Sequence, residues 1–291
     1  MRHIPVLTKE VLEGMQLQPG MVVVDGTLGD GGHALTMLGR IGPSGNLIGI
    51  DADPEAILRA KKILSEHKNV TFVRDNFKNL SQILRGELVD GILLDLGWSL
   101  PQFRERGRGF SFEMDEPLDM RFDPSEGKTA AELIADATAE QLQRILHKYG
   151  EEPRANAIAI ALKKAKPKSS KDVVAAVMSV YKGRGKTHPA TRTFQALRIW
   201  TNDELQVLKD ALNAAENSLK PDGRLAVISF HSLEDRIVKQ FIKASDTLTN
   251  VTKKPVTAGA KELVENPRAR SAKLRVAQKI HATSEENKNV L

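Results

Sequence analysis

The chain has no cysteine among its 291 residues. Disulfides and thiolate metal sites are therefore excluded, and we expect no metal site of another kind. The sequence also lacks any apolar run of membrane-spanning length, and its first ten residues lack the apolar segment of a signal peptide. From these absences we expect a soluble cytoplasmic protein, long enough for one large or two moderate domains.

Positive charge is concentrated in two parts of the chain. The formal net charge is +6. Residues 128–200 hold 14 Lys and Arg against 6 Asp and Glu, and residues 251–291 hold 9 against 4, so the remainder is acidic. A basic middle and tail on an acidic half suggest a polyanionic substrate, most simply a nucleic acid. Solvated, lysine-rich helix faces are the alternative explanation.

One stretch organises the chain, from Val22 to His33. Three valines end at Asp25 and are followed by four glycines within residues 26–32. The valines predict a buried parallel strand, and the apolar spacing after His33 predicts a helix. A second apolar run, 47–50, ends at Asp51. This pattern predicts a β-loop-α-β unit with an acid on its second strand, where the ribose hydroxyls of a cofactor are usually held.

The glycine spacing alone is ambiguous. Gly29-x-Gly31-x-x-Ala34 also fits a dinucleotide fingerprint, and the glycines could simply make a tight turn. A pyrophosphate placed at this loop would meet Asp25 and Asp30, and that like-charge approach is unfavourable. S-adenosylmethionine has no phosphate, and its ammonium and sulfonium favour nearby carboxylates. We therefore expect S-adenosylmethionine, with an NAD(P)-dependent oxidoreductase as the alternative.

Further strands are expected along the chain. Residues 70–73 predict a third strand, 89–95 a fourth that ends in Asp95, and 224–230 a fifth that lies beside the fourth and brings His231 towards Asp95. The tail predicts a closing hairpin from residues 248–256 and 272–277. The whole pattern is typical of a doubly wound α/β sheet, whose ligands bind at the carboxyl ends of the strands.

Between these strands lies a different kind of sequence. Residues 102–123 are dense in Arg, Gly and Phe, which favours an active-site loop that grips phosphates and stacks bases; a loop that buries its own phenylalanines is the alternative. Residues 129–181 have helical periodicity. Thr138 begins a capping box and Ser170 is the expected cap of a later helix. These features predict a helical insertion.

A basic loop and two helices are expected after the insertion. Residues 183–187 (GRGKT) resemble part of a phosphate-binding P-loop, but the leading glycine and the apolar strand before it are missing, so we reject an NTPase. Lys182, Arg184, Lys186 and Arg192 are expected in an RNA footprint. Two helices follow, with Asn202 as the expected cap of the second.

Six ordered stretches carry a resemblance to a known family: 25–33 (DGTLGDGGH), 94–97 (LDLG), 108–112 with 117–121 (RGFSF and PLDMR), 187–198 (THPATRTFQALR), 228–238 (ISFHSLEDRIV) and 266–275 (NPRARSAKLR). The chain resembles the bacterial RsmH/MraW family, which methylates the exocyclic N4 of a cytosine in the decoding region of 16S ribosomal RNA. The resemblance covers nearly the whole chain.

The resemblance implies a Rossmann-like class I methyltransferase sheet with an inserted all-helical domain. We expect residues 1–105 and 193–291 to form the discontinuous methyltransferase domain, and 106–192 the inserted loop and helical RNA-recognition domain. The implied partner is 16S rRNA within the small ribosomal subunit, with a homodimer compatible. The implied contacts with S-adenosylmethionine are Gly31, Gly32, His33, Asp51, Phe77, Asp95 and Gln102.

Four residues are expected to take part in the chemistry. Asp95 would accept a hydrogen bond from the amine, and Phe110 or Phe112 would clamp the base. His231 would hold the base or relay the proton. Their positions at strand ends and in the Arg-rich loop, together with the resemblance, support these roles.

The sequence departs from the family pattern at three places. The family usually has Val-Ser-Ser-Pro-Gln where this chain has Trp98 to Gln102, glycine where it has Glu116, and a more aliphatic pair where it has Trp200 and Thr201. Because the spacing is kept, we expect activity to be retained, with the changes acting on the loop around Trp98. A catalytically silent RNA-binding or assembly factor is the alternative from another class.

Overall fold

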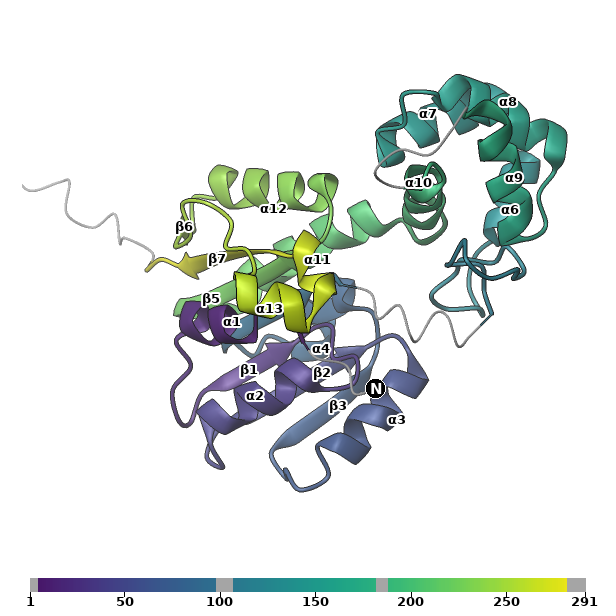
Figure 1. Cartoon of the computed structure of the whole chain (residues 1–291). Coiled ribbons are helices and arrows are strands. Elements are labelled where there is room, and N and C mark those ends of the chain that lie inside the picture. Colours follow the sequence, from purple (N-terminus) through teal and green to yellow (C-terminus); the bar gives the residue numbers. More distant parts are fainter. Residues whose placement is uncertain (1–4, 98–106, 182–187, 282–291) are drawn as a thin grey trace, which may run out of the picture. The chain divides into compact units, whose positions relative to one another are not determined.

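The computed structural model describes residues 5–97, 107–181 and 188–281. The chain forms two compact units: residues 1–98 with 207–291 make the first, and residues 99–206 the second. The first unit has apolar cores on either side of a sheet, and the second has a separate core of its own. In Figure 1 the second unit is the teal and green group of helices.

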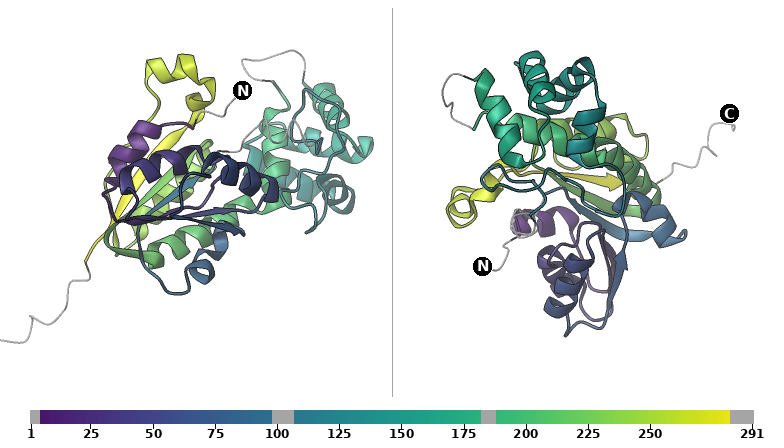
Figure 2. Two further views of the ribbon diagram at one scale, coloured as in Figure 1. Left: turned by 90° about the horizontal axis from the view of Figure 1, so that it is seen from below. Right: turned by 90° about the vertical axis from the view of Figure 1, so that its right-hand side faces the viewer.

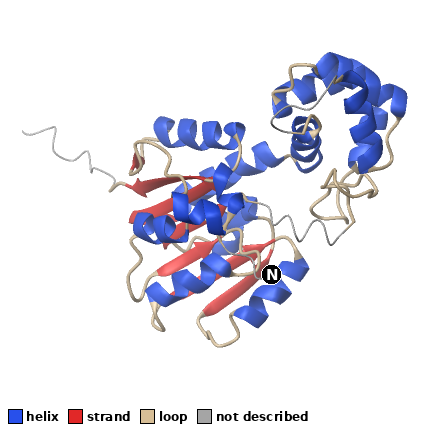
Figure 3. Ribbon diagram, viewed as in Figure 1, coloured by secondary structure: helices blue, strands red, loops and turns tan. Residues whose placement is uncertain are grey.

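A seven-stranded sheet forms the first unit, with the order β3-β2-β1-β4-β5-β7-β6 in the described residues (Figure 3). Strands β1 to β5 are parallel, whereas β7 runs antiparallel to both β5 and β6. The expected doubly wound sheet and its closing hairpin are thus confirmed. The strands are β1 (Val22–Asp25), β2 (Asn46–Asp51), β3 (Val70–Arg74), β4 (Val89–Asp95), β5 (Leu219–Ser229), β6 (Leu248–Asn250) and β7 (Lys273–Lys279).

Helices cover both faces of this sheet, as two views show (Figure 2). One face packs against α1 (Thr8–Met15), α2 (Gly32–Ile41) and α3 (Pro54–Ile63). The other packs against α4 (Leu80–Leu84), α11 (Glu204–Ser218) and α12 (Ser232–Ala244). Three short helices lie in connections: η1 (Phe77–Asn79), α13 (Ala260–Glu265) and η2 (Pro267–Ser271). No helix in the described ranges is long and apolar enough to cross a membrane.

The second unit is helical, as expected for an insertion. Its helices are α6 (Ala130–Asp136), α7 (Ala139–Gly150), α8 (Ala155–Ala165), α9 (Ser170–Val180) and α10 (Thr191–Asn202). The capping box from Thr138 to Gln141 is confirmed. The expected cap at Ser170 is wrong by one residue: Ser169 caps α9, and the Ser170 hydroxyl is buried and donates to the Met114 carbonyl.

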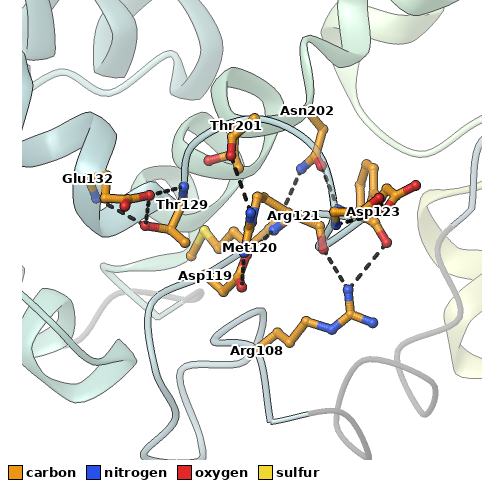
Figure 4. Close-up of polar contacts among 12 residues, drawn as sticks. Arg108, Asp119, Met120, Arg121, Asp123, Thr129, Glu132, Thr201 and Asn202 are labelled. Atoms are coloured by element: carbon orange, nitrogen blue, oxygen red, sulfur yellow. Dashed lines mark hydrogen bonds and ion pairs between the residues drawn. The ribbon is translucent and has the colours of Figure 1, made fainter.

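Asn202 does not cap the next helix either. It is the last residue of α10, and α11 begins at Glu204 after Asp203, whose φ is 48°. The Asn202 amide instead holds the Arg-rich loop: its oxygen accepts from the Phe122 N–H at 2.8 Å, and its nitrogen donates to the Met120 carbonyl at 2.8 Å (Figure 4). The positive φ of Asp203 already turns the chain between α10 and α11. The Asn202 side chain is therefore not needed as a cap and bonds instead to residues about 80 positions earlier in the sequence.

Both arginines at the base of this loop are used internally. Arg108 donates to the carbonyls of Arg121 and Phe122 at 3.0 and 3.2 Å, and Arg121 makes a two-pronged ion pair with Asp119 at 2.7 and 2.9 Å (Figure 4). Such charge-assisted pairs fix geometry. These two guanidiniums therefore help to shape the loop. That the loop also grips phosphates stays a prediction.

Asn202→Ala should destabilise the helical unit. It leaves the Phe122 N–H and the Met120 carbonyl without their partner, at a cost of about 1–3 kcal/mol for a buried polar group. Urea unfolding followed by circular dichroism measures this change. The matched control is Asn156→Ala on the exposed surface of α8, which should stay within about 0.5 kcal/mol of the parent. Equal stability of the two variants would contradict the role given to Asn202.

Candidate cofactor and active site

The loop after β1 is shaped by glycines that no other residue could replace without strain. Gly29 and Gly31 have φ values of 52° and 81°, a region that side chains disfavour. A Cβ on Gly31 would lie 3.2 Å from a methyl carbon of Leu64, and one on Gly32 would lie 3.1 Å from the Pro5 ring. The side chains of Pro5 and Leu64 therefore pack directly against the backbone of this loop, and α2 begins at Gly32.

Three parallel strands bring three carboxylates to one edge of the sheet. β1 ends at Asp25, β2 at Asp51 and β4 at Asp95, and β1 is hydrogen-bonded to both of the others. Because parallel strands end at the same edge, the expected convergence of acids is what the topology produces. The predicted pairing of β4 with β5 is also present, with Asp95 opposite Ile228.

Backbone N–H groups hold these carboxylates in place. Asp51 accepts from the N–H of Gly29 at 2.8 Å with one oxygen and from that of Asp53 at 2.8 Å with the other. Asp95 accepts from the Gly97 N–H at 2.9 Å through Oδ1. Bonds of this kind fix the orientation of the carboxylate.

Asp25 is the most buried of the three. Its residue is 1% exposed, and its Oδ2 has no hydrogen-bond partner among the described residues. Burial raises its pKa from 3.8 to about 6, with Asp95 and Asp51 adding to the rise and His33 and the Thr27 N–H opposing it. Without a bound cation, this carboxyl therefore takes up a proton only a little below neutral pH.

His33 lies between these acids in the first turn of α2. It is 6% exposed, and its Nε2 is 3.4 Å from Oδ2 of Asp95. Neither ring nitrogen has a hydrogen-bond partner within the part of the chain that the structure describes. The structure thus brings together Gly31, Gly32, His33, Asp51 and Asp95 of the predicted site, with Asp25 beside them.

Arg59 on α3 alters one part of the charge argument. Its Nε is 2.7 Å from Oδ1 of Asp30, and further nitrogens lie 3.5 and 3.7 Å from Asp53 and Glu55. Asp30 is therefore neutralised by a cation and is a weaker obstacle to a phosphate than the sequence suggested. The electrostatic selection against an anion rests on Asp25, Asp51 and Asp95. No sequence pattern singled out Arg59, which meets Asp30 only through the packing of α3 on the loop.

Phe77 begins the short helix η1 after β3, where Asn76 caps by accepting from the Lys78 N–H at 3.0 Å. The Phe77 side chain is half-buried and packs against the core that contains α4. Its Cβ is 3.5 Å from the place that a Cβ on Gly26 would take, so it adjoins the start of the glycine loop. That position is compatible with the predicted adenine contact.

The His231 side chain is engaged in capping α12. Its Nδ1 accepts from the Glu234 N–H at 3.3 Å, and its Nε2 is 3.0 Å from a Glu234 carboxylate oxygen. The same carboxylate accepts from the N–H groups of Phe230 and His231 at 2.7 and 3.2 Å. His231 therefore follows the strand beside Asp95, as expected, but its described contacts are with its own helix.

The two predicted base-clamping residues belong to the helical unit. Phe110 stacks on Phe122 with ring centroids 5.6 Å apart. Phe112 stacks on His188 at 4.6 Å and meets Phe194 edge-on at 5.6 Å. Each ring thus has one face covered within its own unit. Gln102 lies outside the described residues.

The chain is similar in sequence to known proteins of one family. The family model described as "MraW methylase family" matches residues 1–280. "Ribosomal RNA small subunit methyltransferase H" of Deinococcus radiodurans is 46% identical, covering 96% of this chain and 90% of that protein. The protein of the same name in Xanthomonas oryzae pv. oryzae is 45% identical, covering 96% and 89%.

Among solved structures, an rRNA methylase from Streptococcus thermophilus has a TM-score of 0.47 at 12% identity and covers 97% of this chain and 99% of its own. TrmN from Thermus thermophilus has a TM-score of 0.49 at 14% identity, covering 94% and 48%. The assignment to a family rests on the similarity in sequence. With a match that extends over residues 1–280, the chain belongs to the MraW methylase family.

Proposed function

We propose that this chain transfers the methyl group of S-adenosylmethionine to the exocyclic N4 of a cytosine in the decoding region of 16S rRNA. The observation that carries the proposal is the cluster of Asp25, Asp51 and Asp95 around a glycine loop in a member of the MraW methylase family. The names of the relatives identify the small ribosomal subunit RNA as their substrate.

The acidic edge fits a cationic cofactor. Asp25 keeps one buried oxygen without a partner in the described residues, and a buried polar atom of this kind calls for a bound group. An ammonium or sulfonium would offset the mutual repulsion of the carboxylates, whereas a pyrophosphate would add to it. Asp51 can accept ribose hydroxyls beside its bonds to Gly29 and Asp53, because a carboxylate has about four acceptor positions.

When bound, the cofactor supplies an electrophilic methyl group. The protein must then present the amine in line with that group at near-attack distance. The lone pair of N4 is delocalised into the cytosine ring. A hydrogen bond from the amine to the Asp95 carboxylate would localise this lone pair on the nitrogen, and the carboxylate would then receive the departing proton. Gly97 fixes one oxygen of Asp95, which leaves Oδ2 to face the amine.

The helical unit is proposed to recognise the RNA, with the methyltransferase domain comprising residues 1–105 and 193–291 and the inserted domain 106–192. The excess of Lys and Arg between residues 128 and 200 supports RNA recognition by this part of the chain. Phe110 and Phe112, which stack on Phe122 and His188, are proposed to clamp the base. His231 is proposed to hold the base, and Gln102 and Phe77 to contact the cofactor.

In this proposal the enzyme acts in the cytoplasm on RNA within the small subunit, and a homodimer is compatible with it. Two experiments test it. Titration with S-adenosylmethionine and with NAD(P) should give saturable binding of the first only, and labelled methyl should enter small subunits from a strain that lacks this protein. Binding of NAD(P) would favour an oxidoreductase, and cofactor binding without methyl transfer would favour a silent RNA-binding factor.

Asp51→Ala should weaken cofactor binding. Losing the acceptor for two ribose hydroxyls costs on the order of 1–3 kcal/mol, which lowers affinity roughly ten- to hundredfold. Calorimetric titration measures the Kd, with Asp246→Ala on an exposed part of the same unit as the control. An unchanged Kd in folded Asp51→Ala would refute the assignment.

Asp95→Asn should slow methyl transfer more than it changes folding. The amide keeps the shape and one acceptor oxygen but loses the charge that stabilises the amine as it becomes positive. Loss of one preorganised electrostatic contact costs about 2.7–4 kcal/mol, or roughly a hundred- to a thousandfold in rate. Single-turnover transfer at saturating cofactor and RNA measures this, with a thermal melt as the folding control. A normal rate would move the catalytic role elsewhere.

Cofactor affinity should depend on pH through Asp25. Its pKa in the folded protein is raised to about 6, and a cation beside it favours the ionised form, so affinity should fall about tenfold per pH unit below 6 and level off above it. The same raised pKa makes the carboxyl a source of instability that grows as pH rises from about 4 to 6. In Asp25→Asn, the Kd measured from pH 5 to 8 should lose this dependence; a parallel slope in both proteins would exclude Asp25.

A further inference from the structure

His33, which is expected to contact the cofactor, has a buried, titratable side chain that the proposed methyl transfer does not yet use. The residue is 94% buried, and both of its ring nitrogens lack a hydrogen-bond partner in the described residues. A neutral imidazole carries one donor and one acceptor, and buried polar atoms without partners are uncommon enough to need a reason. Packing alone would be served as well by an apolar side chain.

Asp95 supplies that reason. Its Oδ2 lies 3.4 Å from Nε2 of His33, slightly longer than a hydrogen bond. Its Oδ1 is already fixed by the Gly97 N–H at 2.9 Å. Oδ2 is the oxygen that would face the amine. Its orientation therefore depends on the group that stands at the position of the His33 Nε2 atom. Catalytic contacts are often long before the substrate binds and tighten in the loaded site.

The other charged groups around His33 favour a donor at this place. Asp25 on β1 interacts electrostatically with His33, and Asp95 on β4 and Asp51 on β2 both act on Asp25. Asp25 and Asp95 thus both act on the imidazole of His33, and Asp51 adds negative charge beside Asp25. A ring that donates through Nε2 reduces the repulsion that would otherwise turn Oδ2 of Asp95 away from the cluster.

We propose that His33 is a positioning residue for the methyl transfer: its Nε2–H donates to Oδ2 of Asp95 and holds that oxygen in the orientation from which it accepts the cytosine N4–H. The inference rests on the proposed function and assigns to the His33 side chain a task separate from contact with the cofactor. It predicts that His33 acts on the rate only through Asp95.

Two variants of His33 separate this role from packing. In His33→Gln the amide nitrogen can take the place of Nε2, whereas the shorter side chain of His33→Asn reaches only the place of Nδ1. Both are polar, but Gln is larger than Asn by one methylene, so a thermal melt of each variant reports any change in packing. Single-turnover transfer at saturating cofactor and RNA should fall about ten- to hundredfold in H33N, the size expected for a lost hydrogen bond to a charged group. H33Q should recover most of that loss. The cofactor Kd of each variant is measured separately, so that the rates are compared at saturation.

A double-mutant cycle with Asp95→Asn completes the test. In the D95N background the carboxylate charge that His33 holds is gone, so H33N and H33Q should differ by less than about twofold. Equal rates for H33N and H33Q in the parent, or a difference that persists in D95N, would overturn the proposal. So would a rate loss that parallels a loss of cofactor affinity. Parent protein that transfers no methyl would instead count against the proposed function.

Discussion

Repulsion among three carboxylates at one edge of a parallel sheet is the constraint around which the first unit is built. Asp25, Asp51 and Asp95 end neighbouring strands, and the fold moderates the cost in different ways: backbone N–H groups satisfy Asp51 and Asp95, while Asp25 has its pKa raised to about 6. Arg59 neutralises the fourth acid, Asp30. What remains is a site short of positive charge, which a sulfonium and an ammonium supply.

The helical unit solves a different problem. The loop after residue 106 carries two arginines. Arg108 donates to the carbonyls of residues 121 and 122, and Arg121 pairs with Asp119. Asn202 ties the same loop to α10. These two cations thus serve internal order, and the region between residues 128 and 200 holds further Lys and Arg residues. The same loop carries Phe110 and Phe112, the proposed base-clamping residues.

The sheet could be predicted from the sequence because its signals are local: β-branched runs that end in acids, and glycines where φ is positive. Helix ends were harder. Ser and Asn commonly cap the N-termini of helices, but the side chains of Ser170 and Asn202 form hydrogen bonds with Met114 and Phe122, which are distant in the sequence. The His33 contact with Asp95 and the Arg59 pair with Asp30 join residues 62 and 29 positions apart, and no local pattern encodes such distances. Strand β5 also begins earlier than expected, at Leu219, and its register against β4 is irregular near its start.

In the proposed function, this acidic site delivers a methyl group to one cytosine amine. The most direct test is to treat small subunits from a strain lacking the protein with the enzyme and isotopically labelled S-adenosylmethionine, digest the 16S rRNA, and locate the label by mass spectrometry. We expect one labelled methyl, on the N4 of a cytosine in the decoding region. Label on a ring carbon, on a ribose or on another RNA would contradict it.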